Sequence, residues 1–578
     1  MKLKLARYLA CICCLFLSSG WATAQHQSVK TEPAKDLNWT HIYVSTKGSD
    51  TNPGTLNKPL RRVSKALAEL KTIDGPVVIK IEPGVYREGN LRIGRRAWPT
   101  VIESSGEQQA VISGSDVWSE WESVGPDWVA AWPYDWGLYQ LDASFPQRDH
   151  DSLTVAGQRS EMVFVDGLRQ VQVTERSDLR PGTFFIDLAV QQIRLRLPDG
   201  TQKDTALIEV GMRPNLLAAL QPKDLTLRRL TFQHAVSHTT RKDKGFETWG
   251  VCIFGEHVSG ISNDASKPDR VFAENILLED CRFIQNNRYG LTVANTKRFK
   301  AIRCQFSDNG VMGFNANRNR YVHIEDSQFD RNNWRLGFLG HVIGWHPAGT
   351  KMLFMSDMDI VRSTFRDNFA TGLWLDTSVN HVRILDSVIE GNWGTGFYYE
   401  HSQGPALLKN SLVRRNGFND GSRTIRGFDG GVLFAESEHL TIESSRIEEN
   451  INFQIGARPR PRAGGCYWTN RHIDGSCRHL TLLNSTIVGT YFDGPNVPEY
   501  YNAREHRHST LVGMSQHGIS DMYAADFPTT FRGSGNTYVY SDQNVTFSTG
   551  PNWGYQRISL SAWQDLTAQD KDSVFVTE

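Results

Sequence analysis

Residues 281–309 read CRFIQNNRYGLTVANTKRFKAIRCQFSDN, so a unit of the form C-x-F-x-x-N begins at Cys281 and returns at Cys304. The unit recurs five more times with serine in place of cysteine. Each copy has phenylalanine, isoleucine or valine two residues on and asparagine five residues on. The copies are 23 or 24 residues apart, except for one step of 36 and one of 34. The units begin at Cys281, Cys304, Ser327, Ser363, Ser387, Ser411 and Ser445, and their asparagines are Asn286, Asn309, Asn332, Asn368, Asn392, Asn416 and Asn450.

This period predicts a stacked solenoid in which each copy forms one coil. Leucine-rich repeats have a similar period, but they need leucines at fixed positions that are missing here. The runs between the units alternate apolar and polar residues, as in Val322-His323-Ile324, which is typical of short strands. We therefore expect an all-β protein, a right-handed parallel β-helix with coils about 4.8 Å apart.

Equal positions in successive coils of such a stack form columns. We expect the asparagines to form one inward-facing column that satisfies backbone groups of the turns. The Phe/Ile/Val positions should lie in the core. Cys281 and Cys304 belong to the Cys/Ser column, which favours buried small side chains over a redox pair.

A further column lies thirteen residues after the start of the unit and reads Ala294, Asn317, Gly340, Asp376 and Glu400. Its last two members are carboxylates on adjacent coils, with Cα atoms about 5 Å apart. Like charges paired across strands destabilise a fold, and one of the two pKa values should rise. A retaining glycosidase needs two carboxylates at about this separation, one as nucleophile and one as acid/base. A pair of solvated surface acids, or a calcium site, would also fit the spacing.

The sequence around this pair favours catalysis. Aromatic residues flank it, and their faces can stack on sugar rings. The two long steps add loop residues on the same side of the stack, one in the coil before Asp376 and one in the coil after Glu400, which predicts the walls of a cleft. The substrate contacts expected from these segments are Asn317, Trp345, His346, Lys351, Trp374, His401, Arg423 and Arg426.

The stretches GLWLD (372–376) and GFYYEHSQGP (396–405), with GWHPAGTK (344–351) upstream, resemble secreted parallel β-helix glycoside hydrolases. The resemblance is greatest to the β-xylosidases of glycoside hydrolase family 120. It implies a pectate-lyase-like solenoid with a small β-sandwich-like insertion, and an oligo- or polysaccharide substrate of plant or algal origin. It also implies that Asp376 is the nucleophile and Glu400 the acid/base. The tyrosines of GFYYEHS depart from the smaller apolar residues of the family pattern, so the sugar stays open.

Two other functions fit parts of the sequence. A polysaccharide lyase acting on an acidic glycan would need a calcium cluster or a Lys/Arg base, and Lys351 and the loop arginines keep that alternative open. A non-catalytic carbohydrate-binding solenoid would have no reason to pair two acids in one column. No Cys/His group has the spacing of a zinc site and no stretch is dense in Asp and Asn, so we expect no metal or other cofactor.

The composition and the N-terminus predict an exported protein. Lys plus Arg and Asp plus Glu both total 63, and this neutral balance does not indicate a nucleic-acid or membrane partner. Residues 1–24 have a basic start, a short apolar middle and the end Ala22-Thr23-Ala24, which is typical of a secretory signal. We expect a periplasmic or extracellular protein. In that compartment Cys466 and Cys477, which share one Gly-rich loop, should form a disulfide.

The repeat also divides the chain. Residues 58–70, KPLRRVSKALAEL, predict a short capping helix, and the repeat vanishes where strand-like alternation is broken by turn dipeptides. The expected parts are a signal peptide at 1–24, an N-terminal cap with the first coils at 25–118, an inserted β-rich subdomain at 119–207, the main β-helix with the cleft at 208–493, and a C-terminal cap region at 494–578.

Overall fold

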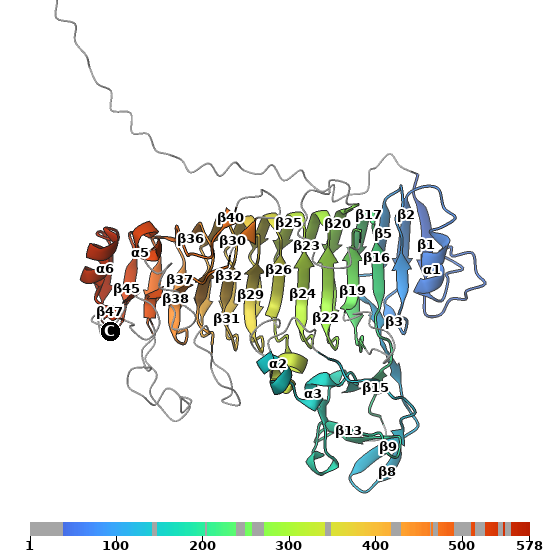
Figure 1. The fold of residues 1–578 in the computed structure, drawn as a ribbon. Coiled ribbons are helices and arrows are strands. Elements are labelled where there is room, and N and C mark those ends of the chain that lie inside the picture. Colours follow the sequence, from blue (N-terminus) through green and yellow to red (C-terminus); the bar gives the residue numbers. More distant parts are fainter. Residues whose placement is uncertain are drawn as a thin grey trace, which may run out of the picture.

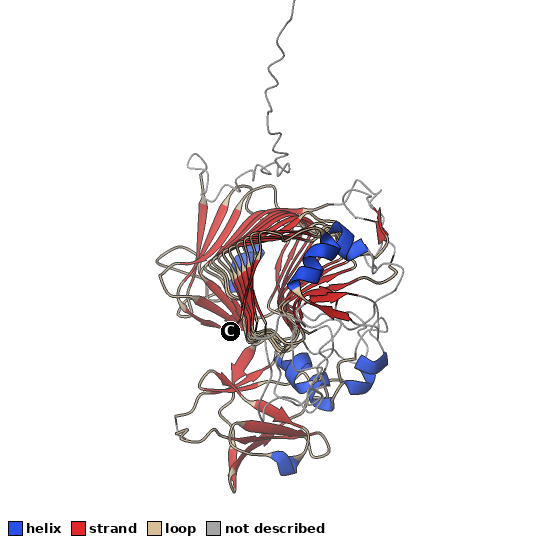
Figure 2. Ribbon diagram, turned by 90° about the vertical axis from the view of Figure 1, so that its left-hand side faces the viewer, coloured by secondary structure: helices blue, strands red, loops and turns tan. Residues whose placement is uncertain are grey.

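The chain folds into a right-handed parallel β-helix, seen from the side in Figure 1 and along the stack in Figure 2. The predicted fold class is therefore confirmed. The computed structural model describes residues 38–140, 147–202, 205–237, 249–256, 271–341, 348–417, 429–462, 464–465, 472–489, 510–514, 526–540, 547–549 and 556–577. The predicted signal at 1–24 lies outside these residues. Within the described part, no helix is long and apolar enough to cross a membrane.

Three sheets run along the stack. Sheet I contains β1 (Thr40–Val44), β2 (Val77–Ile81), β5 (Thr100–Ser104), β17 (Lys223–Arg228), β20 (Ala273–Glu279), β23 (Thr296–Ile302), β25 (Arg320–Glu325), β27 (Ser356–Val361), β30 (Asn380–Leu385), β33 (Ala406–Lys409), β36 (Leu440–Glu443), β41 (Thr481–Leu483) and β44 (Arg532–Ser534), in that order.

Sheet II lies beside it and carries the predicted carboxylates. It contains β4 (Leu91–Ile93), β16 (Leu217–Leu220), β19 (Trp249–Phe254), β22 (Tyr289–Ala294), β24 (Met312–Asn317), β26 (Ala348–Leu353), β29 (Thr371–Asp376), β32 (Phe397–Glu400), β35 (Val432–Ala435), β38 (Phe453–Arg458), β43 (Thr510–Met514), β46 (Phe547–Thr549) and β47 (Gln556–Ile558). All of its strand pairs are parallel except β46 with β47.

Sheet III contains the short strands of the repeated unit and has two parts. The first contains β3 (Gly84–Tyr86), β6 (Ala110–Ser113), β18 (Leu230–Gln233) and β21 (Arg282–Ile284); the second contains β28 (Thr364–Arg366), β31 (Val388–Glu390), β34 (Leu412–Arg414), β37 (Arg446–Glu448), β42 (Thr486–Val488), β45 (Thr537–Val539) and β48 (Val574–Val576). Single bridges through Gln305 and Gln328 connect the two parts.

The ladders begin within 25–118, where the first coils were expected, since β1, β2 and β5 open sheet I. They also continue past residue 493, because β44, β45 and β48 extend sheets I and III toward the C-terminus. The described strands of the region 494–578, which was expected to be a cap, therefore add coils to the stack. A helix covers each end (Figure 1): α1 (Val63–Glu69) at the N-terminal end and α6 (Leu560–Thr567) at the C-terminal end.

A small lobe interrupts the early coils and projects from the side of the stack (Figure 1). Its two sheets, β11-β10-β15-β7 and β12-β13-β14-β9-β8, share a core that includes Phe164 and Phe184 and also Trp334 of the main helix. The strands are β7 (Ser115–Val117), β8 (Glu122–Val124), β9 (Asp127–Ala131), β10 (Val163–Val165), β11 (Leu168–Arg169), β12 (Val171–Val173), β13 (Thr183–Asp187), β14 (Gln192–Arg196) and β15 (Ile208–Gly211). The short elements α2 (Gln147–Ser152), α3 (Val155–Gln158), η1 (Arg176–Asp178), η2 (Trp334–Leu339), β39 (Gly464–Gly465), β40 (His472–Ile473) and α5 (Asp526–Thr530) complete the description.

The predicted asparagine column is confirmed. The seven asparagines are fully buried, and each Nδ2 donates to the Oδ1 of the asparagine in the next coil, at 2.8–3.2 Å, up to Asn450, whose Nδ2 donates to Gln454 Oε1 at 2.8 Å. A parallel column of serine hydroxyls accepts from backbone N–H groups, for example Ser387 Oγ from Ser363 N at 3.1 Å. These ladders pair buried polar groups that would otherwise cost free energy.

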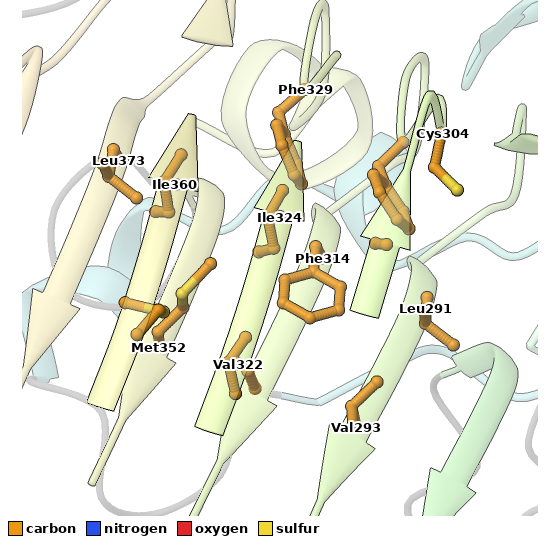
Figure 3. Close-up of a cluster of buried hydrophobic side chains, with 14 of the residues drawn as sticks. Leu291, Val293, Cys304, Phe314, Val322, Ile324, Phe329, Met352, Ile360 and Leu373 are labelled. Carbon is orange, nitrogen blue, oxygen red and sulfur yellow. The ribbon is translucent and has the colours of Figure 1, made fainter. Parts of the chain in front are cut away.

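Apolar columns fill the space between the sheets. Phe283, Phe306, Phe329 and Phe365 stack on one another with ring centroids 4.7–5.3 Å apart. Figure 3 shows inward-facing side chains of neighbouring coils meeting in this core, with Phe314 beside Ile324. Cys281 and Cys304 are buried free thiols in the same core, as the Cys/Ser column predicted.

The predicted disulfide between Cys466 and Cys477 is not formed in this structure. Cys477 is a free, fully buried thiol that donates to Phe434 O at 3.2 Å, so its sulfur points into the core. Cys466 lies outside the described residues.

Candidate active site

The two carboxylates predicted from the repeat lie side by side. Asp376 ends β29, Glu400 ends β32, and the parallel register pairs them directly. The inward residues of both strands, such as Leu375 and Tyr399, belong to the core, so alternation places Asp376 and Glu400 on the outer face of sheet II. The sequence alignment of this column needs one correction. Leu353, and not Gly340, precedes Asp376, because the extra residues of that coil come before β26.

Asp376 is held as an anion. Its Oδ2 lies 3.0 Å from Lys351 Nζ, and its Oδ1 accepts from Thr377 Oγ1 at 2.7 Å. The side chains of Lys351 and Asp376 are 5% and 10% exposed, so solvent screens this ion pair weakly. Burial alone would raise the pKa of Asp376, but the Lys351 ammonium and the Thr377 hydroxyl outweigh it and lower that pKa below its ordinary value.

Glu400 has the opposite electrostatic environment. Burial, together with the Asp376 and Glu436 carboxylates, raises the pKa of Glu400 to about 7. Its Oε2 accepts from Trp374 Nε1 at 3.0 Å and its Oε1 accepts from Arg462 Nη1 at 2.9 Å. Two adjacent carboxylates whose pKa values are pushed apart can divide acid and nucleophile roles between them.

Aromatic rings adjoin the pair. Trp374 stacks on Tyr398 with centroids 4.8 Å apart and an interplanar angle of 18°. The Lys351 ammonium lies 3.4 Å from the centroid of the Trp374 ring, a cation–π contact that fixes both side chains. The rings also pack against Leu433 and Phe453 of the two following coils.

Two arginines, Arg460 and Arg462, link Glu400 to a further carboxylate, Glu436. Arg462 Nη1 donates to Glu436 Oε2 at 3.2 Å as well as to Glu400, and Arg460 Nε lies 2.7 Å from Glu436 Oε1 in an ion pair without hydrogen-bond geometry. His401 Nε2–H donates to the backbone oxygen of Arg462 at 3.1 Å. Burial, followed by the nearby Arg462 charge, lowers the pKa of His401, which keeps its ring neutral.

The structure brings together only some of the predicted substrate contacts. Lys351 and Trp374 touch the carboxylate pair, and His401 touches one of the two arginines. Asn317 belongs to the same column as Asp376, but two strands away, since Leu353 lies between them. Four further residues lie outside the described part of the chain: Trp345, His346, Arg423 and Arg426.

Sequence reasoning missed Glu436 and the arginines. Glu400 pairs with Ala435, and Glu436 is the next residue, so extending the carboxylate column by the step of 34 residues leads to Phe434 and misses Glu436. The alternation ARPRPR at 457–462 signalled arginines on one face, but nothing in the sequence showed where that segment runs. No group of three or more metal-ligating side chains occurs among the described residues.

Comparisons with known proteins agree with this architecture. The family model of the right-handed β-helix region matches residues 250–422. No curated protein matches the sequence. The solved complex of XylC with xylose is similar in fold, with a TM-score of 0.62 at 12% identity, and the match covers 93% of this chain and 86% of that one.

Two further solved structures are more distant. One is described as a glycoside hydrolase (TM-score 0.45, 11% identity, 88% of this chain and 94% of that one). The other is the A-module of the mannuronan C-5 epimerase AlgE6 of Azotobacter vinelandii (TM-score 0.43, 12% identity, 89% and 94%). At these identities the likeness shows the fold alone.

Proposed function

We propose that this chain is a retaining glycoside hydrolase that acts on saccharides derived from plant or algal polysaccharides, with β-xylosidase-like activity. The observation that carries the proposal is the pairing of Asp376 with Glu400 in register, both buried, with pKa values moved in opposite directions. Carboxyl groups about 5–5.5 Å apart are what a retaining mechanism requires.

In this mechanism Asp376 attacks the anomeric carbon while Glu400 protonates the departing glycosidic oxygen. A covalent glycosyl–Asp376 ester results, and Glu400 is left as a carboxylate. Glu400 then takes a proton from the attacking water, whose oxygen forms the new bond to the anomeric carbon as the ester bond breaks. Lys351 stabilises Asp376 as the anion that begins and ends this cycle.

Trp374 helps to orient the proposed acid/base. The ring is 2% exposed, with the Lys351 ammonium over it and Tyr398 stacked against it, so its Nε1–H holds Glu400 in a fixed position. XylC has this fold and was solved with xylose, which makes xylosides the first sugars to test. We also propose export, because the predicted signal at 1–24 would direct such an enzyme to its extracellular or periplasmic substrate.

The site supports a lyase less well. A lyase needs a base that can abstract a proton beside a uronate carboxyl group. Lys351 is engaged by Asp376, and Arg462 is shared between two glutamates, so both cations are already engaged with carboxylates of the site.

The proposal is tested by hydrolysis of a panel of aryl glycosides. Asp376→Ala should abolish turnover, whereas Glu400→Ala should retain the first step on activated aryl glycosides, which need no proton. Azide should then rescue Glu400→Ala and give a glycosyl azide of retained configuration. Asp386→Ala, which removes an exposed carboxylate elsewhere on the stack, is the matched control and should leave turnover unchanged.

An azide product of inverted configuration from Glu400→Ala would mean that the two roles are exchanged. An unsaturated product from the native chain would identify a lyase. Full activity in both site variants would exclude this pair as the catalytic centre.

A further inference from the structure

Glu436 is a third carboxylate of the site and the most deeply buried one. Its side chain is 0% exposed, against 9% for Glu400. It lies between two arginines, with Arg462 Nη1 3.2 Å from Oε2 and Arg460 Nε 2.7 Å from Oε1. Arg458 Nη2 is 3.9 Å from Oε1. A carboxylate in such a position is costly to bury unless it is paired, so it must have cations beside it.

One nitrogen atom connects Glu436 to the proposed acid/base. Arg462 Nη1 donates to Glu436 Oε2 at 3.2 Å and to Glu400 Oε1 at 2.9 Å. A guanidinium beside a carboxyl group stabilises the carboxylate, and the first step of the proposed reaction needs the acid form of Glu400. Arg462 alone would therefore oppose that step.

Many charged or titratable groups face Glu400, and the balance of their charges decides whether Glu400 is protonated. The anionic groups favour the acid form of Glu400, whereas the cations favour the carboxylate. The groups, from all the elements packed around it, are Asp376 of β29, Lys351 of β26, Tyr398 and His401 of the β32 segment, Glu436 after β35, Arg458 at the end of β38, and Arg460 and Arg462 of the following segment.

We propose that Glu436 is a positioning residue that holds Arg462 as a counter-ion shared with Glu400, so that Glu400 keeps its proton until the glycosidic bond breaks. This inference rests on the proposed role of Glu400 as acid/base. Once Glu400 has given up its proton, the same Nη1 is already at hydrogen-bond distance from Oε1 and stabilises the new carboxylate. No group has to move between the two states.

The test is the pH dependence of kcat/KM, which reports the free enzyme. Activity on a substrate with a poor leaving group should fall as the pH rises through the pKa of Glu400, near 7. Glu436→Gln removes a neighbouring negative charge and should move this basic limb to lower pH by about 1 unit. Arg462→Met removes the opposing positive charge and should move it to higher pH.

Glu438→Gln is the matched control, since Glu438 lies only two residues after Glu436 but pairs with Arg478 at 3.6 Å. The basic limb of the pH profile of Glu438→Gln should not move.

A uniform loss of activity in Glu436→Gln without movement of the limb would show a structural role only and overturn the inference. Should Glu436→Gln fail to fold, Arg462→Met provides the test. A basic limb that does not move in Arg462→Met would also contradict the inference. A native enzyme that hydrolyses no glycoside would instead refute the proposed function itself, and one that hydrolyses glycosides without a basic limb would refute the role of Glu400 as the general acid.

Discussion

Asn392→Ala should destabilise the protein more than any exposed substitution of the same type. Asn392 lies in the middle of the asparagine column and is fully buried. Its Nδ2 donates to Phe365 O at 2.9 Å and to Asn416 Oδ1 at 2.8 Å. Its Oδ1 accepts from Asn368 N at 3.1 Å and from Asn368 Nδ2 at 2.8 Å. The substitution removes all four hydrogen bonds at once.

The expected loss follows from these contacts. A buried hydrogen bond contributes about 1 kcal/mol net, so four contribute about 4 kcal/mol. Asn368 Nδ2 retains Phe329 O as an acceptor at 2.9 Å, so that amide is not left without a partner by the change. We therefore expect a decrease of about 3–5 kcal/mol in the free energy of unfolding.

The assay is urea denaturation followed by tryptophan fluorescence, with Asn410→Ala as the control. Asn410 occupies the next coil, is exposed, and donates to Asp386 at 3.2 Å. Its replacement should cost about 1 kcal/mol, because it removes one exposed hydrogen bond and places alanine at a φ of 51°. A loss below about 1 kcal/mol for Asn392→Ala, or one equal to that of the control, would refute the claim that the column stabilises the stack.

Three further results are expected. Lys351→Met removes the ammonium that holds the pKa of Asp376 down, so the acid limb of the pH–rate profile should move up by about 1–3 units; an unmoved limb would disprove that pairing. Gly372→Ala would place a Cβ 2.6 Å from Asn392 Nδ2, so the melting temperature should fall, and an unchanged value would contradict the packing. Burial raises the pKa of the Cys477 thiol to about 12, so a thiol reagent should label it only after denaturation; a disulfide-linked Cys477 peptide would contradict the free thiol.

The sequence predicted the parts of the structure that repeat. Asn286 through Asn450 fall into one ladder because a stacked coil converts a constant offset into contact between neighbours. Asp376 and Glu400 were found by the same logic, since 24 residues separate them and no insertion intervenes.

The sequence failed where coils differ in length. Gly340 was placed in the carboxylate column in the position of Leu353, because the offset was counted through an insertion. Glu436 was missed because the partner of Glu400 in its coil is Ala435, one residue earlier. Arg462 was missed because it lies after the end of β38, outside the repeated unit. The predicted disulfide of Cys477 failed for another reason. Spacing shows how near two residues are along the chain, but not that one of them faces the core.

The double-displacement mechanism is tested most directly by identifying the carboxylate that bonds to the sugar. Incubation with a 2-deoxy-2-fluoro glycoside that carries an activated aryl leaving group should trap the covalent intermediate, and mass spectrometry of the digested protein should locate it. We expect one glycosyl group per chain, on the peptide that contains Asp376, and none in Asp376→Ala. A sugar on Glu400 would exchange the two roles, and turnover of the native substrate without any adduct would contradict the double-displacement mechanism.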